Sequence, residues 1–215
     1  MQGQVTRPFV MGICGGSCSG KSSLVAALCE RLEVAPARLC FDSYYRPLGH
    51  LQPAVREQEN FDHPDSLDAR LFAAHLDALI DGDSVAEPVY DFARHDRSEQ
   101  SRKVTPAGVI VVDGILLFHW PELVSRLDWR VFVECDPATR LSRRLARDVM
   151  ERGRSEASVR AQFEATVAPM HRRFVEPSAA LAQRRVAGAA DLDSLADELC
   201  AELSQRLAEF GAAAL

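Results

Sequence analysis

Apolar residues in this chain gather in short runs separated by longer stretches of helical spacing. The run Phe9–Cys14 and the predicted strand Val109–Gly114, which begins with four apolar residues, are mostly apolar, which is typical of strands buried on both faces. Weaker runs predict three more strands, at Arg38–Phe41, Arg130–Glu134 and Arg184–Ala187. Strands that alternate with helical segments indicate an α/β fold with three layers, α/β/α, around a mostly parallel five-stranded sheet.

Helical periodicity fills the stretches between these strands. It predicts helices over Lys21–Leu32, from Leu67 to Ile80, over Ala157–Val175 and over Leu192–Phe210. Asp65 or Ser66 is expected to cap the second of these helices, and Pro169 to kink or break the third. Residues 49–60 show no periodicity and predict a mobile loop.

We predict a single domain over residues 1–215 with one small sheet of its own beside the main one. The segments Val85–Asp91 and Lys103–Thr105 are expected to pair as a β-hairpin. The hairpin forms an insertion over about residues 84–105, away from the main sheet.

The segment after the first strand has the spacing of a phosphate-binding loop, G-x-x-x-x-G-K-S. Glycines let the backbone curl around an oxyanion, and the amides of the loop converge on it at the start of a helix. Lys21 is expected to reach the β- and γ-phosphates and Ser22 to hold Mg²⁺. We therefore predict a P-loop NTPase-type fold whose triphosphate, ATP or GTP, is bound by Gly15, Gly16, Ser17, Cys18, Ser19, Gly20, Lys21, Ser22 and Ser23.

Three aspartates stand at or just beyond predicted strand ends: Asp42, Asp62 and Asp113. Phosphoryl transfer to an alcohol needs one carboxylate to hold Mg²⁺ and another to position the hydroxyl and take its proton. Asp113 suits the first role because its strand is expected beside the phosphate-loop strand. Asp42 suits the second because its strand is the other candidate neighbour. The alternative, a helix cap or turn residue, is the common role of a lone aspartate after a strand. The predicted metal ligands are Ser22, Asp42 and Asp113.

Arginines crowd the helix that Asp136 and Pro137 open. Arg140 and Arg144, like Arg143 and Arg147, are neighbours at i, i+4, and Arg152 and Arg154 follow around a glycine. A solvated face of ion pairs with the nearby acids is the alternative. The excess of arginine favours a mobile helical lid, over about residues 140–165, that closes over the triphosphate and stabilises charge in the transition state.

Aromatic residues gather in segments predicted as loops and hairpin. They are Tyr45, Phe61, Tyr90 and Phe92, with His95 close by. Aromatic side chains usually belong to a core. The polar neighbourhood of these favours a site in which rings enclose a flat heterocycle and His95 bonds its edge.

Charge and composition narrow the class of protein. The formal net charge of −6 disfavours a general nucleic-acid binder. The six cysteines are scattered without metal spacing and indicate reduced thiols in a cytosolic protein. No apolar run has the length of a membrane span, and no signal sequence is evident, so we expect a cytoplasmic protein without membrane partners.

In their order along about residues 8–177, these motifs resemble those of uridine/cytidine kinases in the phosphoribulokinase/uridine kinase family. The resemblance rests on Gly15–Ser22, Phe41–Arg46, Asn60–Asp65, Pro88–Phe92 with His95 and Arg97, Asp113–Leu116, Thr139–Arg144, Arg147–Asp148, Glu151–Arg154 and Gln162. It implies ATP-dependent phosphorylation of the 5′-hydroxyl of uridine or cytidine to UMP or CMP, in pyrimidine salvage. It also implies a homo-oligomer, typically a tetramer, that pyrimidine triphosphates inhibit.

The resemblance assigns roles to the residues named above. Asp42 would be the catalytic base, with Lys21, Arg147 and Arg152 as further catalytic residues, while Ser22 and Asp113 arrange Mg²⁺. The nucleoside would be bound by Asp42, Tyr45, Phe61, Asp62, Tyr90, Phe92, His95, Arg147 and Gln162, with Asp62, Arg147 and Gln162 on the ribose. Donor phosphate would be contacted from the lid by Arg144, Arg152 and Arg154.

The chain departs from the family pattern in two places and leaves alternatives open. After Pro177 the usual lead into the last strand and its Pro-Arg-Gly turn are missing, and Asp113 stands where many relatives have Glu. A kinase of the same architecture for another small alcohol or a sugar phosphate is the nearest alternative. A nucleotide-dependent switch would need an N-K-x-D element, which the chain lacks. An RNA-binding protein that uses the arginines is disfavoured by the acidic total. Uridine and cytidine, and ATP and GTP, stay equal alternatives.

Overall fold

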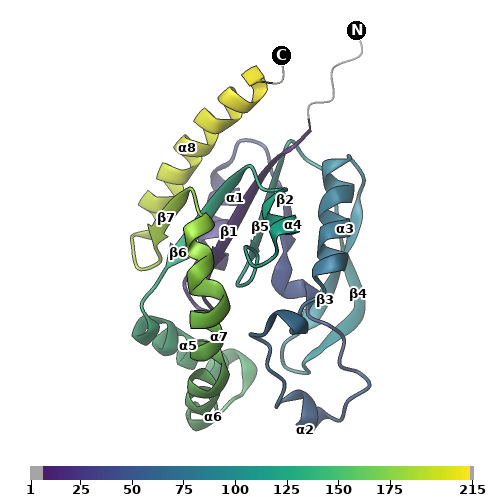
Figure 1. Cartoon of the computed structure of the whole chain (residues 1–215), viewed down its shortest axis with the longest axis vertical. Helices are drawn as coiled ribbons and strands as arrows, with labels where there is room; N and C mark the ends of the chain where they lie inside the picture. Colours follow the sequence, from purple (N-terminus) through teal and green to yellow (C-terminus); the bar gives the residue numbers. More distant parts are fainter. Residues whose placement is uncertain (1–6, 214–215) are drawn as a thin grey trace.

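The computed structural model describes residues 7–213 and centres on a five-stranded sheet (Figure 1). Every pair of neighbouring strands in the sheet is parallel, in the order β2-β5-β1-β6-β7. The predicted three-layer α/β fold is thereby confirmed. The strands are β1 (Phe9–Gly15), β2 (Ala37–Cys40), β5 (Val109–Gly114), β6 (Trp129–Glu134) and β7 (Arg184–Ala187).

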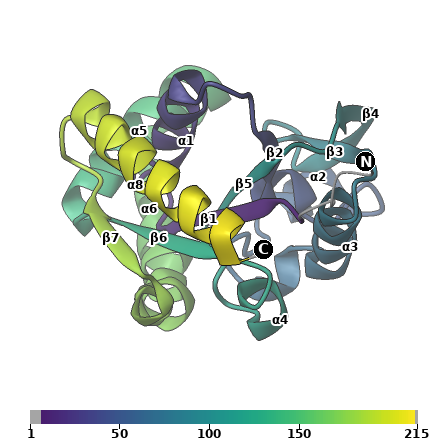
Figure 2. The same cartoon turned by 90° about the horizontal axis from the view of Figure 1, so that it is seen from above.

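Helices cover both faces of this sheet (Figure 2). On one face α1 (Lys21–Arg31) and α8 (Leu192–Ala213) lie side by side, joined by ion pairs from Arg31 to Asp193 and Asp197. The other helices are α2 (Pro53–Arg56), α3 (Ala69–Ile80), α4 (Pro121–Val124), α5 (Pro137–Arg152), α6 (Glu156–Gln162) and α7 (Ala168–Met170). No helix within residues 7–213 is long and apolar enough to cross a membrane.

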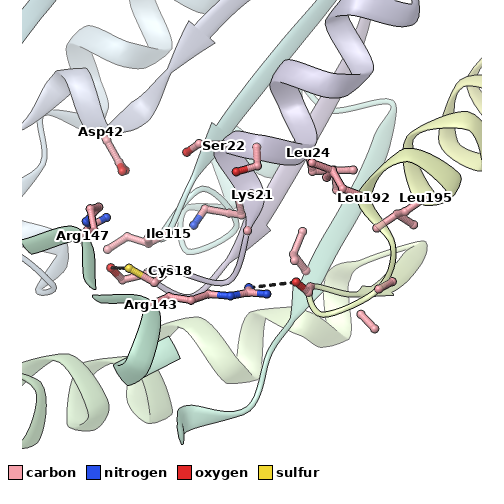
Figure 3. Close-up of a pocket in the computed structure, with 17 residues that line it drawn as sticks. Cys18, Lys21, Ser22, Leu24, Asp42, Ile115, Arg143, Arg147, Leu192 and Leu195 are labelled. Carbon is pink, nitrogen blue, oxygen red and sulfur yellow. Dashed lines mark hydrogen bonds between the residues drawn. The ribbon is translucent and has the colours of Figure 1, made fainter. Parts of the chain in front are cut away.

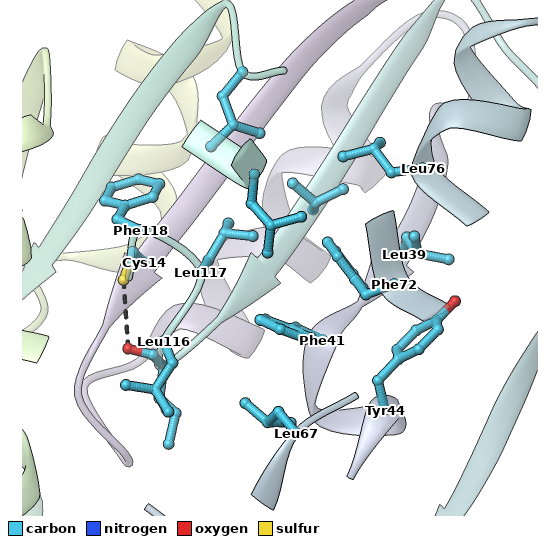
Figure 4. Packing of buried hydrophobic residues seen from close by; sticks show 14 of the residues in the cluster. Cys14, Leu39, Phe41, Tyr44, Leu67, Phe72, Leu76, Leu116, Leu117 and Phe118 are labelled. Carbon is cyan, nitrogen blue, oxygen red and sulfur yellow. Dashed lines mark hydrogen bonds between the residues drawn. The ribbon is translucent and has the colours of Figure 1, made fainter. Parts of the chain in front are cut away.

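Alternate side chains of β1 enter two separate cores. Met11 and Ile13 pack with the apolar faces of α1 and α8, whereas Val10 and Cys14 face the opposite side, as the two-residue period of a strand requires. In the second core Phe41 stacks on Phe72 of α3, with 4.3 Å between ring centroids (Figure 4). This core therefore fixes the turn that follows β2.

The position of β2 corrects one expectation. We expected the strand that leads to Asp42 to lie directly beside the phosphate-loop strand, but β2 pairs with β5, and the second neighbour of β1 is β6. The strand also ends at Cys40, and Asp42 lies in a short 3₁₀ turn, Phe41–Tyr44. Because parallel strands end at one edge of the sheet, Asp42 still lies at the ligand-binding edge.

Two predictions about helices need adjustment, one on a helix cap and one on the effect of Pro169. The helix that ends at Ile80 is capped by Asp68, whose carboxylate accepts a hydrogen bond from the Leu71 amide over 3.2 Å, and not by Asp65 or Ser66. The helical run around Pro169 changes winding, with π-helical segments at Phe163–Val167 and His171–Val175. Proline has no amide hydrogen, so regular α-helical bonding cannot continue through it.

The small hairpin forms a separate two-stranded sheet, β3 (Val85–Asp91) and β4 (Asp96–Val104). Its second strand is longer than the sequence indicated. Glu87 of β3 is buried, pairs with Arg102 and accepts a hydrogen bond from the Cys40 amide over 2.7 Å. Arg97 of β4 donates to the Tyr45 carbonyl over 2.7 Å. The hairpin is thus fastened to both sides of the turn that carries Asp42.

The segment over residues 49–60 is more ordered than its lack of periodicity indicated. It contains the short helix α2, and Arg56 at the end of α2 pairs with Asp96 of β4 at 3.2 Å. Arg56 also donates to the Leu51 carbonyl over 2.9 Å. These bonds hold the segment against the hairpin.

Candidate active site

The phosphate loop joins β1 to α1 and is shaped by its own backbone. Gly20 has a φ of 104° and Cys18 a φ of 61°, so the chain enters the left-handed region twice before α1. The Ser19 amide donates to the Gly16 carbonyl over 3.1 Å, and the Lys21 ammonium donates to the same carbonyl over 3.0 Å. Lys21 is buried. The loop therefore holds a buried positive charge at the start of α1, which suits an anion.

A cavity of about 530 Å³ opens at this loop, and we call it the donor cavity (Figure 3). Asp42 and Lys21 lie toward one end of it, and Leu192 and Leu195 of α8 toward the other. A polar end and an apolar end suit a triphosphate joined to a base. Of the predicted loop residues, those that line the cavity are Ser17, Cys18, Gly20, Lys21, Ser22 and Ser23, whereas Gly15, Gly16 and Ser19 do not.

A second cavity of about 600 Å³, which we call the acceptor cavity, lies between the hairpin, the residues around α2, and the α5–α6 region. The two cavities share Ser17, Asp42, Ile115 and Arg147. The structure brings together all nine residues predicted to bind a nucleoside, since the lining includes Asp42, Tyr45, Phe61, Asp62, Tyr90, Phe92, His95, Arg147 and Gln162.

Aromatic rings form one wall of the acceptor cavity. The Phe61 and His95 rings stack with 4.6 Å between centroids and 15° between planes. Tyr45 and Tyr90 are both 7 % exposed, and the buried Tyr90 hydroxyl has no hydrogen-bond partner within residues 7–213. An orphaned hydroxyl at a cavity wall is a ready partner for a ligand.

His95 combines backbone strain with a shifted proton affinity. Its φ is 50°, in the left-handed region that few non-glycine residues adopt. Burial, followed by the charges of Arg154 and Arg152, lowers the pKa of His95 below its usual value. At neutral pH the ring is therefore uncharged, with one nitrogen donor and one acceptor.

Asp62 and Asp42 bring carboxylates to the same cavity. Asp62 is 8 % exposed, and burial raises its pKa, while the Arg144 charge opposes that shift. One oxygen of Asp42 is buried without a hydrogen-bond partner among the described residues. Both groups have hydrogen-bonding capacity left for hydroxyl groups of a ligand.

The arginines of the predicted lid converge on one carboxylate. Asp148 of α5 is fully buried and lies within 4 Å of the guanidinium groups of Arg144, Arg147, Arg152 and Arg154. The Arg154 amide also donates to the Asp148 carbonyl, around Gly153, which has a φ of 63°. Asp148 thus sets the positions of the basic side chains.

These arginines divide between the cavities in a way that the sequence did not indicate. Arg144, Arg152 and Arg154, predicted to contact donor phosphate, line the acceptor cavity, whereas Arg143 lines the donor cavity and Arg147 lines both. Arg144 does reach the phosphate loop, because it donates to the Ser17 hydroxyl over 3.0 Å. It also donates to Gln162 over 2.9 Å.

The acid pair at the sheet edge can take a divalent cation. Asp113 is 2 % exposed, and burial together with the Asp42 charge raises its pKa to about 6. One oxygen of Asp113 is buried without a hydrogen-bond partner in the described chain, and Arg38 lies 3.8 Å from it. Two carboxylates short of partners, one of which lines the same cavity as Ser22, fit Mg²⁺, which keeps several of its waters. Within residues 7–213 no group of three or more His, Cys, Asp or Glu side chains could hold a metal.

Some residues of the site escaped sequence reasoning. Glu57 and Gln58 line the acceptor cavity from the segment read as a loop. Asp148 was seen only as a nearby acid, although its i, i+4 spacing to Arg144 and to Arg152 is a usable signal. No comparable pattern marks Glu57 or Gln58.

Comparisons with solved structures place the fold. The chain superposes on phosphoribulokinase from Rhodobacter spheroides with a TM-score of 0.63 and 8 % identity, covering 85 % of this chain and 70 % of that one. D-glycerate 3-kinase from Cryptococcus neoformans matches with a TM-score of 0.61 and 15 % identity, covering 83 % and 82 %. At such identities the likeness concerns the fold.

Sequence comparisons find relatives of much higher identity than these solved structures. A uridine kinase of Chloroflexus aurantiacus is 47 % identical over 174 residues, covering 80 % of this chain and 83 % of that protein. A uridine kinase of Clostridium perfringens is 39 % identical over 173 residues, with the same coverage. The model of the phosphoribulokinase/uridine kinase family matches residues 10–189. A kinase of this kind uses a nucleotide as phosphoryl donor. The chain belongs to the phosphoribulokinase/uridine kinase family.

Proposed function

We propose that this kinase transfers the γ-phosphoryl group of ATP to the 5′-hydroxyl of uridine or cytidine and forms UMP or CMP. The observation that carries the proposal is that Asp42 borders both cavities. An alcohol in the acceptor cavity and a triphosphate in the donor cavity would therefore meet at one carboxylate. The uridine kinases that match most of the chain support the same activity.

The donor cavity suits a nucleoside triphosphate in one orientation. Lys21 and the loop amides would bind the β- and γ-phosphates, which leaves the base at the apolar end near Leu192 and Leu195. Apolar side chains give few hydrogen bonds with which to tell adenine from guanine. We therefore propose ATP as the donor and GTP as an accepted alternative.

The acceptor cavity suits a pyrimidine nucleoside. Its aromatic wall can pack against a face of a flat base, and the uncharged His95 ring can bond the base edge. Asp62 and Arg147 can bind the ribose hydroxyls, with Gln162 at the same wall. The hairpin is thereby an acceptor-side insertion, and the arginine-rich α5–α6 region is a lid over the reacting groups.

In the proposed reaction one P–O bond forms, another breaks and one proton moves. The 5′-oxygen forms a bond to the γ-phosphorus as the bond to the bridging oxygen of ADP breaks, and the hydroxyl proton passes to Asp42 late in a loose transition state. Mg²⁺, when bound, neutralises charge on the β- and γ-oxygens. Ser22 and Asp113 would hold that ion. Lys21, Arg147 and Arg152 would offset the charge that remains.

Two broader features complete the proposal. We infer a homo-oligomer, a tetramer by family resemblance, acting in the cytoplasm on small molecules rather than on nucleic acid or membranes. Sedimentation at micromolar concentration tests the first feature: a monomer at all concentrations contradicts it.

An acceptor panel tests the proposed reaction. Purified protein with Mg²⁺ and ATP is offered uridine, cytidine, a purine nucleoside, a pentose phosphate and glycerate, and nucleotide products are separated by chromatography. We expect UMP and CMP to form at least tenfold faster than any other product. The second candidate is a sugar-phosphate or small-alcohol kinase of the same fold. Its acceptor would have no flat ring to stack on Phe61 and His95. Fast turnover of such an acceptor, without UMP or CMP, would replace the proposal with this candidate.

A further inference from the structure

Arg140 of α5 is a charged side chain sealed inside the protein. It is 1 % exposed, and its Nε and Nη1 atoms have no hydrogen-bond partner among residues 7–213. The ion pairs formed within these residues do not include it. Its ring contact is with Phe163, at 5.8 Å from the guanidinium carbon to the centroid. A buried charge without a partner lowers the stability of the free protein.

The guanidinium lies directly behind the phosphate loop. A Cβ atom added to Gly16 would come within 2.8 Å of Arg140 Nη1 and within 2.9 Å of the His171 ring. The Lys21 ammonium donates a hydrogen bond to the carbonyl of the same glycine. Arg140 lines neither the donor nor the acceptor cavity. It therefore approaches the loop from the side away from both ligands.

His171 adds no compensating charge at this place. Its Nδ1 atom is buried without a partner in the described chain, and burial, with the Arg140 and Lys21 charges, lowers the pKa of His171 to about 4. The ring is neutral at physiological pH and cannot offset the arginine. Two fixed positive charges thus flank Gly16.

We propose that Arg140 is a buried counter-charge for the donor phosphates, which acts on them through the Gly16 backbone rather than by contact. The free protein is destabilised by this charge, and an anion in the loop relieves the destabilisation. The charge is far from solvent, so its attraction for an anion is little screened by salt. This role deepens the proposed donor site and rests on it.

Opposite changes in stability and in anion binding test the proposal. In Arg140→Met, which keeps most of the side-chain length, we expect the melting temperature of the ligand-free protein to rise by about 3 °C or more. The Kd for ATP and for inorganic tripolyphosphate, measured by calorimetry, should rise about tenfold or more. Arg140→Lys keeps a charge and should retain most of the affinity. Arg172→Met removes an exposed arginine beside His171 and should change neither quantity.

Each other outcome contradicts the proposal. Unchanged tripolyphosphate affinity in Arg140→Met means that the charge does not act on the anion. Lower stability together with lower affinity, or failure of Arg140→Met to fold, means that the side chain serves packing. Loss of affinity in Arg140→Lys equal to that in Arg140→Met means that the guanidinium shape matters rather than its charge. Tripolyphosphate binding involves no acceptor, so an absence of uridine turnover in the wild-type protein would count against the proposed function alone.

Discussion

The two cavities meet at Asp42 but are built in different ways. The donor cavity rests mainly on one continuous segment, residues 15–23, which offers backbone amides and a buried lysine to a ligand. The acceptor cavity is assembled from side chains of the hairpin, the residues around α2 and the α5–α6 region. In kinases of this kind a local motif can bind the nucleotide donor that many kinases share. Side chains from separate parts of the chain can bind the acceptor, which differs from one kinase to another. We therefore expect substrate specificity to depend mainly on the acceptor cavity, whose residues have the weaker sequence signal.

The supports of the two sides differ as well. The donor side is held by the parallel sheet and by α1, which follows the loop without a break. The acceptor side depends on single polar contacts, such as Glu87 with the Cys40 amide and Arg97 with the Tyr45 carbonyl. Loss of one such contact is expected to affect the acceptor more than the donor.

The largest expected effect is at the shared residue. Asp42→Asn keeps the size of the side chain but removes the proton acceptor, so kcat should fall by about 10²–10⁴-fold. Nucleotide binding should stay nearly intact, because Lys21 and the loop amides are unchanged. Steady-state kinetics and ATP calorimetry measure the two quantities.

Asp65→Asn, a change in an exposed side chain on the same part of the chain, is the matched control and should have normal kcat. If Asp42→Asn loses ATP affinity as strongly as turnover, the residue acts mainly as a metal ligand or a structural group on the donor side, and not as the proton acceptor. Asp42 would then belong to the donor side alone and would not serve both cavities.

Removal of the arginine anchor should damage mainly the acceptor side. Asp148→Asn leaves four guanidinium groups without their buried carboxylate, so the free energy of unfolding should fall by about 2–3 kcal/mol. The KM for nucleoside should rise more than that for ATP, because all four arginines line the acceptor cavity and, of these four, Arg147 alone also lines the donor cavity. Urea unfolding and kinetics with each substrate varied in turn measure these changes.

Asp193→Asn, in an exposed ion pair with Arg31, removes the same charge and should cost no more than about 1 kcal/mol. Equal increases in both KM values for Asp148→Asn would show that the lid serves the two sides alike.

Sequence reasoning succeeded where local patterns determine structure. The apolar runs of β1 and β5 and the glycine spacing of the phosphate loop are consequences of neighbouring residues, and the structure has these elements at the predicted places. Asp42 was assigned to the sheet edge although its strand lies one position further out. That assignment survives because all parallel strands of the sheet end at the same edge.

The sequence was a poor guide where contacts between residues far apart in the chain determine the structure. The cap at Asp68 was missed because Asp65 and Ser66 have equally good capping side chains, and only tertiary packing starts the helix later. The division of the arginines between cavities depends on how α5 lies against the phosphate loop. The part of the cavity wall near Glu57 comes from a segment without periodicity, which carries no pattern to interpret.

A smaller effect is expected at the aromatic wall. His95→Ala removes a stacked ring and a hydrogen-bonding edge, so the nucleoside KM should rise about 10–30-fold while the KM for ATP changes less than twofold. The exposed His50 gives the control His50→Ala, which should leave both constants unchanged. An unchanged nucleoside KM in His95→Ala would make His95 a structural residue and shift selectivity to the tyrosines.

The smallest expected effect concerns Asp113, a predicted Mg²⁺ ligand at the end of β5 that lines neither cavity. Its pKa of about 6 in the folded protein lies above the ordinary value of 3.8, so between these values the folded protein retains a proton that the unfolded chain releases. Stability without metal should therefore fall as the pH rises from about 4 through 6, and the last part of this fall, between about pH 5.5 and 7, should be roughly 1 kcal/mol. Asp113→Asn cannot titrate, so urea unfolding should show its stability relative to wild type improving by that amount over the same interval. Asp83→Asn, in an exposed turn, should show no such trend. A constant difference between wild type and Asp113→Asn would mean that Arg38 already neutralises Asp113, and that Asp113 is not free to bind Mg²⁺.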